Sequence, residues 1–252
     1  MKIIEASHEI IKAPLYGEAL NLLEVAARVC YKSEDKIKPG SAEKLIESCI
    51  RRGHHSILEH INITVRFICS RGISHELVRH RHCAFSHEST RYCNYGGKDM
   101  EFIKPFWFDE SDSLSSARWN DAMDNSAFYY NDMLQKSLLP QAARGVLPND
   151  LKTEIIVTAN IREWRHILDL RTAGAAHPDM RILMKPLLAE FKEKYPVLFA
   201  NSFYSFLIEY YYKIRITLKV LICFRLPISP TARENLRQIW ILFFENCFFQ
   251  FN

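Results

Sequence analysis

The sequence predicts a mixed α+β fold. Residues Ile61–Ile68 alternate strictly between apolar and polar side chains, which is typical of a strand with one buried face. Residues Thr153–Ala159 form a short, mostly apolar and β-branched run, which indicates a second, buried strand. Several longer segments, Tyr16–Tyr31 among them, repeat apolar residues at helical spacing. Strands and helices therefore share the chain.

The segments before the first of these strands predict one strand and two helices. The opening letters MKIIEA predict a short strand, and Tyr16–Tyr31 an amphipathic helix. Gly40 and the residue after it provide a stop and an N-cap, so a second helix is expected over Ser41–Arg52, ending at Gly53.

After the alternating strand, Ser70 is expected to cap a short helix over Ile73–His80. A polar segment, Arg79–Tyr92, follows this helix and reads RHRHCAFSHESTRY. Gly96 and Gly97 close it.

The second half predicts a long helix over Ser113–Leu139 and helical structure over Pro140–Val146. Two further helices are expected over Arg162–Thr172 and Asp179–Lys194, the latter strained by Pro186. The long helix offers as candidate core residues Leu114, Trp119, Met123, Phe128, Tyr129 and Met133.

Composition changes near residue 200. Residues 201–252 hold 13 of the chain's 31 aromatic residues and show no clear apolar period. No linker or repeat interrupts the chain before Phe199. We therefore expect one domain over residues 1–200 and an atypical aromatic-rich extension over residues 201–252, which is either an added packing layer or a segment with little role in the fold.

Charge and cysteine usage narrow the class of protein. The formal net charge is +4, too mild by itself to predict nucleic acid binding. The seven cysteines form no CxxC pair, and no apolar run approaches the roughly 20 residues that a membrane span needs. The opening residues lack the apolar core of a signal peptide. Reduced thiols in a cytoplasmic protein are expected.

The Arg79–Tyr92 segment favours anion binding. Four basic residues and one acidic residue, Glu88, fall between Arg79 and Lys98. There is no P-loop and no GxGxxG turn, so side chains would have to hold any phosphate. Arginine suits this task because its planar, permanently charged fork binds phosphate in a bidentate manner.

Two other kinds of site remain open. Six histidines in two groups allow a metal-dependent hydrolase built on His54, His60, His80 and His82, although no HExxH occurs and arginines flank His80. Cys83, Cys93 and Ser89 lie near histidines, but no nucleophile signature surrounds them. A basic nucleotide-binding module without catalysis is the third possibility.

One pattern of residues is similar to a known family. Arg79-His80-Arg81 followed after seven residues by Ser89 gives RHR-x7-S, which resembles the signature of the flavin-dependent thymidylate synthases. Other segments resemble that family in the same order, over about residues 1–200. They are AARVCYKSE (Ala26–Glu34), GHHSILEH (Gly53–His60), ISHELVRHR (Ile73–Arg81), FSHESTRYCNY (Phe85–Tyr95), ARGVLP (Ala143–Pro148), TANIREWRHILDLR (Thr158–Arg171) and KYPVLF (Lys194–Phe199).

The resemblance implies a fold and a reaction. The expected fold is a twisted, largely antiparallel sheet flanked by helices. The expected reaction is reductive methylation of dUMP to dTMP, with methylenetetrahydrofolate as carbon donor, NADPH as electron source and FAD as hydride carrier. A homotetramer with active sites at subunit interfaces is also implied.

The resemblance assigns roles to particular residues. Arg171 is expected at the uracil ring, where its charge would stabilise the anion formed as N3 loses its proton. The implied FAD-binding residues are His54, Ser56, Arg79, His80, Arg81, His87, Asn160, Arg162 and His166. The implied dUMP-binding residues are Glu76, Arg79, His87, Glu88, Ser89, Thr90, Arg91, Arg144 and Arg171. His87 and His166 differ from the commoner residues of the family.

Overall fold

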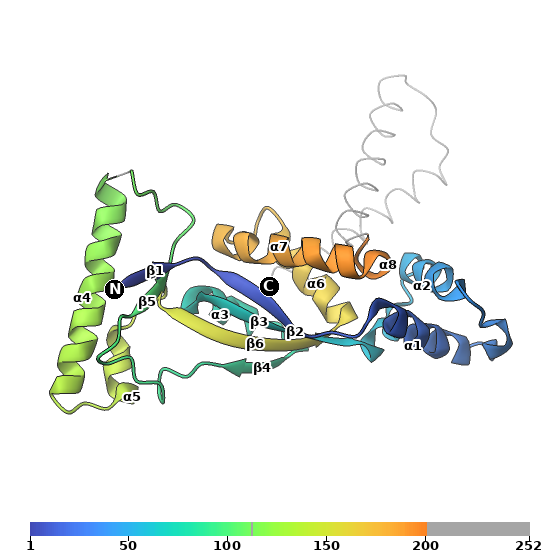
Figure 1. Cartoon of the computed structure of the whole chain (residues 1–252), viewed down its shortest axis with the longest axis horizontal. Helices are drawn as coiled ribbons and strands as arrows, with labels where there is room; N and C mark the ends of the chain where they lie inside the picture. Colours follow the sequence, from blue (N-terminus) through green and yellow to red (C-terminus); the bar gives the residue numbers. More distant parts are fainter. Residues whose placement is uncertain (112, 201–252) are drawn as a thin grey trace, which may run out of the picture. The chain divides into compact units, whose positions relative to one another are not determined.

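The computed structural model describes residues 1–111 and 113–200 (Figure 1). The expected extension over residues 201–252 lies outside the described residues. No described helix is long and apolar enough to cross a membrane. The strands are β1 (Lys2–Ile4), β2 (Ser7–Lys12), β3 (Asn62–Ser70), β4 (Ala84–His87), β5 (Glu101–Ile103) and β6 (Lys152–Asn160). The α-helices are α1 (Tyr16–Val29), α2 (Ser41–Arg51), α3 (Arg71–Leu77), α4 (Ser113–Gln135), α5 (Pro140–Ala143), α6 (Ile161–Thr172), α7 (Pro178–Lys194) and α8 (Pro196–Phe199). Short 3-10 helices are η1 (Glu34–Lys36), η2 (His55–His60) and η3 (Arg144–Val146).

A four-stranded antiparallel sheet in the order β2-β3-β6-β4 confirms the expected fold class. The alternation predicted for β3 is present: Ile63, Val65 and Phe67 are fully buried. They join one core with the buried residues of β6, α6 and α7, and Figure 1 shows α6 and α7 beside this sheet. Thr64 and Arg66 alternate with these residues and contact Thr158 and Glu9 respectively, so the other face of the sheet is polar.

A second core lies beside a two-stranded parallel sheet of β1 and β5. Trp119 and Met123 of α4 are buried there as predicted, and the Trp119 indole donates to Asp150 at 2.7 Å. Three other predicted core residues are exposed instead, by 59%, 63% and 53%: Leu114, Phe128 and Tyr129. The buried stripe of α4 includes Ser116, Trp119, Met123 and Tyr130, so spacing rather than residue type decides its inner face.

Some short elements differ from the expectation. Sequence analysis did not predict β2, β4 and β5. These strands have three to six residues, and apolar and polar residue types do not alternate clearly along their sequences. Ser70 caps α3 as predicted, accepting from the backbone N–H of Ile73 at 3.3 Å, but the helix covers Arg71–Leu77 rather than the expected Ile73–His80. The helix predicted over Asp179–Lys194 is continuous through Pro186, whose ring lacks the N–H of a regular helix position.

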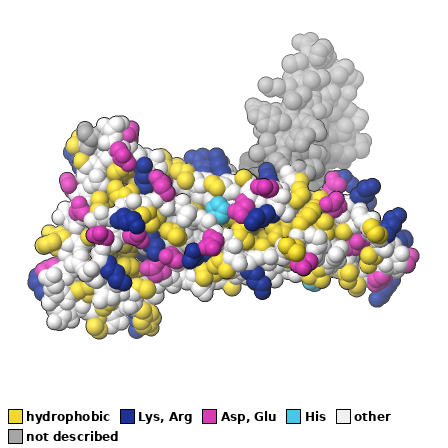
Figure 2. Space-filling model, viewed as in Figure 1, with side chains coloured by type: hydrophobic (Ala, Val, Ile, Leu, Met, Phe, Trp, Pro, Cys, Tyr) yellow, Lys and Arg dark blue, Asp and Glu magenta, His cyan; other side chains and the backbone are white. Residues whose placement is uncertain are grey.

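Both signs of charge are interspersed over the face drawn in Figure 2. Apolar side chains gather there over the end of the domain that carries α1 and α8. This face therefore shows no single-sign field of the kind that a nucleic acid surface would require.

Candidate functional site

Arg171 is the centre of a polar cluster at the end of α6. Its Nε donates to Nε2 of His80 at 2.9 Å, and its Nη1 donates to a carboxylate oxygen of Glu76 at 2.8 Å. Its Nη2 donates to the main-chain carbonyl of Glu76 at 3.1 Å. Arg171 therefore directly contacts two other residues that sequence analysis assigned to the site, His80 and Glu76.

The sheet topology explains why residues about 90 positions apart meet. β3 and β6 are antiparallel, so Ser70 at the end of β3 lies beside Lys152 at the start of β6. Asn160 ends β6 and caps α6, its side-chain oxygen accepting from the backbone N–H of Glu163 at 2.9 Å. The 12 residues of α6 then span about 18 Å. The last turn of α6 returns over the sheet to the end of α3, where Glu76 and His80 lie.

A buried carboxylate adjoins the cluster. Glu163 is 8% exposed and His80 is 6% exposed, and Oε1 of Glu163 lies 3.6 Å from Nδ1 of His80. The ring of His166 meets that of His80 edge-on, with centroids 5.8 Å apart. The interaction with His80 lowers the pKa of Glu163 despite its burial. Desolvation on the inner side of the His166 ring lowers the pKa of this histidine, although the residue as a whole is exposed.

The arrangement does not favour a metal site. Ligand atoms of His80, Glu163 and His166 lie within 4.8 Å of one another; within the described ranges, this group includes none of the other proposed hydrolase histidines, His54, His60 and His82. A metal-bound imidazole carries its proton on the other ring nitrogen and donates with it. Nε2 of His80 instead accepts a hydrogen bond from Arg171, which has only donors. A metal ion on Nδ1 of His80 would place the ring proton on Nε2, where it would face the N–H on Nε of Arg171.

The segment after β4 is anchored through Glu88. The carboxylate of Glu88 accepts from the Tyr95 hydroxyl at 2.7 Å and from the backbone N–H of Glu154 at 3.1 Å. Lys152 lies 3.6 Å from the same carboxylate. Burial, reinforced by Glu88, raises the pKa of Tyr95, so its hydroxyl stays a donor. Both oxygens of Glu88 therefore contact protein groups that fix the following loop.

The loop of Ser89, Thr90 and Arg91 lies beside α5 and η3. Nη1 of Arg144 donates to the buried Thr90 hydroxyl at 3.4 Å, and Nε of Arg91 donates to Gln141 at 3.2 Å. The Ser89 hydroxyl accepts from the backbone N–H of Arg91 at 3.3 Å. Arg144, which is 54 positions from Thr90 in the sequence, is thus brought to the loop that carries Arg91 and the two hydroxyls.

His87 lies just before this loop, at the end of β4. Its Nε2 is 3.1 Å from the hydroxyl of Thr153, and Arg71 donates to the same hydroxyl. Burial, followed by the charge of Arg71, lowers the pKa of His87. This histidine is therefore neutral at physiological pH and contacts β6.

The remaining predicted residues are more dispersed. His54 and Ser56 are exposed around the start of η2, and the exposed Arg162 pairs with Glu59 at 2.6 Å. Arg79 and Arg81 are exposed on either side of the buried His80. Among the residues that the structure describes, no side chain pairs with either of these two guanidiniums. A single chain therefore does not enclose all the predicted cations in one cleft.

Cys83 is not activated as a nucleophile. Burial, together with the nearby Glu163 carboxylate, raises the pKa of its thiol to about 12. The thiol is therefore protonated near neutral pH, and the thiolate is the reactive form.

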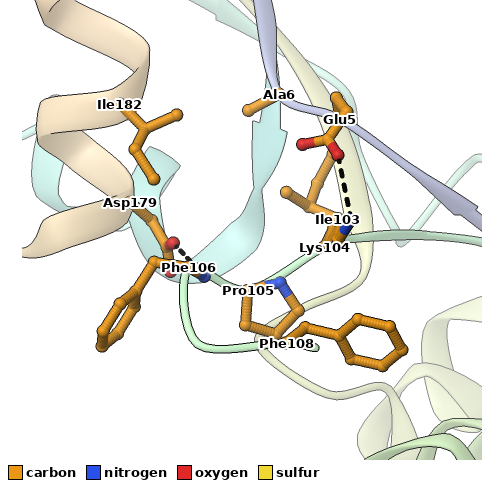
Figure 3. Close-up of a pocket in the computed structure, with 9 residues that line it drawn as sticks. All are labelled: Glu5, Ala6, Ile103, Lys104, Pro105, Phe106, Phe108, Asp179 and Ile182. Carbon is orange, nitrogen blue, oxygen red and sulfur yellow. Dashed lines mark hydrogen bonds and ion pairs between the residues drawn. The ribbon is translucent and has the colours of Figure 1, made fainter. Parts of the chain in front are cut away.

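A cavity of about 250 Å³ lies away from these clusters (Figure 3). Phe106 and Ile182 line it, and Asp179 accepts there from the Phe106 backbone N–H at 2.7 Å. Lys104 lies 3.6 Å from Glu5 at its other side. The lining includes none of the residues predicted for catalysis or binding.

Sequence reasoning missed Glu163, Tyr95 and Gln141. Glu163 stands three residues after the helix cap Asn160, a spacing that by itself suggests only a capping box. Tyr95 and Gln141 reach the site through contacts with Glu88 and Arg91, which leave no local signal in the sequence.

Acid should destabilise the apo-protein from about pH 6.5 downward, the ordinary histidine pKa. Burial lowers the pKa values of His55 and His87, both of which are partly buried. Below the unfolded pKa the unfolded chain binds protons that the folded chain refuses, so the free energy of unfolding falls with pH. Urea titrations between pH 8 and 5 measure this, and His55→Gln should make the slope shallower. A constant stability from pH 7 to pH 5 would contradict the assignment.

Comparison with known proteins finds a matching family model and proteins of similar sequence. Residues 15–197 match the family model described as "Thymidylate synthase complementing protein". The flavin-dependent thymidylate synthase of Corynebacterium efficiens is 36% identical over 199 residues, covering 71% of this chain and 78% of that protein. The one of Mycobacterium tuberculosis is 32% identical over 198 residues, covering 71% and 78%.

A solved structure shares the fold. The UMP/dUMP methylase PolB from Streptomyces cacaoi, bound with 5-Br dUMP, superposes with a TM-score of 0.67. The likeness covers 79% of this chain and 96% of that one, at 23% sequence identity. At 23% identity this likeness shows that the two chains share a fold.

Proposed function

Because the chain belongs to the flavin-dependent thymidylate synthase family, we propose that it methylates dUMP at C5 to give dTMP. The proposed carbon donor is methylenetetrahydrofolate, and the proposed electron source is NADPH. FAD, when bound, supplies the hydride for this chemistry. The chain's own residues bind and orient the substrates and stabilise charge.

The observation that carries the proposal is the guanidinium of Arg171, held by His80 and Glu76. A fixed cation beside the pyrimidine would stabilise negative charge as N3 loses its proton, which makes C5 more nucleophilic. Arg171 is partly buried, so its charge is less screened than that of a surface arginine.

The exposed cations suit the anionic parts of the ligands. A flavin dinucleotide carries two phosphates, and the exposed guanidiniums of Arg79 and Arg81 have no side-chain partner among the described residues, so both are free to bind an anion. His54, Ser56, Asn160, Arg162 and His166 are the further FAD contacts that we propose. In His80 both ring nitrogens face protein groups, so its contact with flavin would use the ring face or a ring carbon.

The dUMP phosphate fits the loop of Ser89, Thr90 and Arg91 together with Arg144. The Arg144–Thr90 hydrogen bond brings a second arginine to this loop. We propose that Glu88 acts on dUMP binding by fixing this loop through its hydrogen bond from Tyr95. His87 precedes the loop, and we propose that its neutral ring contributes a contact to flavin or nucleotide.

A homotetramer would complete the site. Arg79 and Arg81 are exposed, and the Arg171 and Ser89 clusters are held by separate contacts within one chain. We propose that these surfaces face another copy of the chain, so that the cations of different clusters meet across a subunit interface.

The proposal is tested by purifying the full chain, recording its visible spectrum and following dTMP by mass spectrometry. A yellow protein that forms dTMP only with dUMP, methylenetetrahydrofolate and NADPH together is expected. A colourless protein that binds dUMP without turnover would favour a binding module. A zinc-containing colourless protein would favour the hydrolase.

Replacing Ser89 by alanine should weaken dUMP binding about 5- to 10-fold, the equivalent of roughly one hydrogen bond, and leave measurable turnover. The reason is that we give the Ser89 hydroxyl a binding role in the phosphate loop. Calorimetric titration with dUMP measures the affinity, and Ser111→Ala, at an exposed serine before α4, is the control. Unchanged dUMP binding with complete loss of turnover would instead make Ser89 a nucleophile.

A further inference from the structure

We propose that Glu163 is a positioning residue for the reaction: its carboxylate fixes the tautomer of His80, and His80 then holds the guanidinium of Arg171. The proposal rests on the proposed function only in giving Arg171 a role at the pyrimidine. The chain of contacts is a property of the folded protein and is testable without turnover.

The hydrogen-bond donors determine which way the contacts from Arg171 through His80 to Glu163 run. Arg171 Nε carries one hydrogen and cannot give up its charge, so it donates to Nε2 of His80 at 2.9 Å. Nε2 must then hold a lone pair, and the neutral ring carries its proton on Nδ1. That N–H faces Oε1 of Glu163 at 3.6 Å, which is longer than a hydrogen bond, so the carboxylate acts on the N–H dipole through its negative charge.

Burial makes this orientation effective. His80 and Glu163 are 6% and 8% exposed, so water screens their interaction weakly. The interaction with His80 lowers the pKa of Glu163, which is therefore a carboxylate at neutral pH. A carboxylate on one side and a donor on the other both select the Nδ1–H tautomer. Without Glu163, only Arg171 would select it.

The contacts with His80 and Glu76 also determine which N–H groups of Arg171 remain for a ligand. Arginine has five N–H donors in one plane. His80 takes the one on Nε, and Glu76 takes one from each terminal nitrogen. Among the described residues, one N–H on Nη1 and one on Nη2 are left. This pair can donate to a pyrimidine whose oxygens gain negative charge.

Loss of Glu163 should therefore act on the chemical step more than on binding. A guanidinium displaced by about 1 Å costs about 100-fold in rate when it stabilises the transition state. Because the N–H on Nε would no longer be held by His80, while Glu76 still accepts from the two terminal nitrogens, the guanidinium could tilt, and we expect the rate constant kcat to fall about 10- to 100-fold. The KM for dUMP should change less, because the phosphate is held at the Ser89 loop.

The test compares Glu163→Ala and Glu163→Gln with wild type by histidine-selective ¹⁵N NMR of the full-length holoenzyme. The His80 signal is assigned by its loss in His80→Asn. Wild type should show a protonated Nδ1 and an unprotonated Nε2. Glu163→Gln should retain this tautomer, because an amide oxygen also accepts from Nδ1–H. Glu163→Ala should populate the Nε2–H tautomer in part, because only the Arg171 hydrogen bond then opposes it, with the fall in kcat given above.

The exposed Glu193 on α7 offers a matched control, since Glu193→Ala should alter neither the tautomer nor kcat. An alanine variant that keeps the Nδ1–H tautomer and wild-type kcat would overturn the proposal. The proposal would also be overturned if each wild-type chain bound one zinc ion and Glu163→Ala removed it, because His80, Glu163 and His166 would then form a metal site. If the alanine variant does not fold, an Nε2–H tautomer in wild type or in Glu163→Gln overturns the proposal equally. If wild type forms no dTMP, the proposed function fails while the tautomer still tests the contacts.

Discussion

Replacing Arg171 by alanine is expected to lower dTMP formation about 10²- to 10³-fold, with FAD still bound. This is the range for removing a pre-organised donor from a developing anion. The guanidinium is held by His80 and Glu76 rather than by surface solvent. Lysine should not restore the activity, because its three N–H donors lie on one nitrogen and cannot reproduce the planar spread of the three hydrogen bonds.

The measurement is single-turnover dTMP formation, with flavin content read from the visible spectrum of the same sample. Arg118→Ala serves as a control because Arg118 is exposed on α4, away from the cluster. Wild-type turnover in the Arg171→Ala variant would remove this residue from the mechanism. Loss of flavin together with activity would instead give Arg171 a binding role.

Replacing Trp164 by alanine should lower the free energy of unfolding by about 3–5 kcal/mol, the cost of truncating a large buried aromatic side chain. Trp164 is fully buried, and its indole donates to the Ile63 carbonyl of β3 at 3.0 Å. Its ring also packs against Phe67 of the sheet and Phe191 of α7. One side chain therefore joins three elements of the main core.

Urea denaturation of the apo-protein measures this loss. Trp107→Ala is the matched control, because Trp107 is 42% exposed and should cost less than about 1 kcal/mol. Trp164→Phe should lie between the two, since it keeps most of the buried area and loses the indole hydrogen bond. A loss below about 1 kcal/mol for Trp164→Ala would contradict the packing described for α6.

Local patterns predicted the central elements of the fold. β3 and β6 were predicted because strict alternation and a β-branched run leave few other structures. The helix expected over Arg162–Thr172 corresponds to α6, whereas its cap, Asn160, is a finding of the structure. The three short strands were missed because their pairing comes from the partner strands. On α4, Phe128 and Tyr129 are exposed whereas Tyr130 is buried, since only Tyr130 continues the spacing of Trp119 and Met123.

The site was predicted less completely than the fold. Resemblance identified Arg171, His80 and Glu76, and the structure brings these three together. Their contacts span more than 90 positions, and no local pattern records such pairs. Glu163 was missed because a glutamate at this helix position normally caps the helix, whereas here it faces His80.

The central claim is that Arg171 and the arginines around His80 and Ser89 hold dUMP beside a flavin for methylation at C5. Tritium release from dUMP labelled at C5 tests it most directly, with the purified full chain, methylenetetrahydrofolate, and NADPH present or omitted. The account predicts release that depends on NADPH and falls at least 100-fold in Arg171→Ala. Release at the wild-type rate in that variant, or no release from a flavin-loaded protein saturated with dUMP, would contradict it.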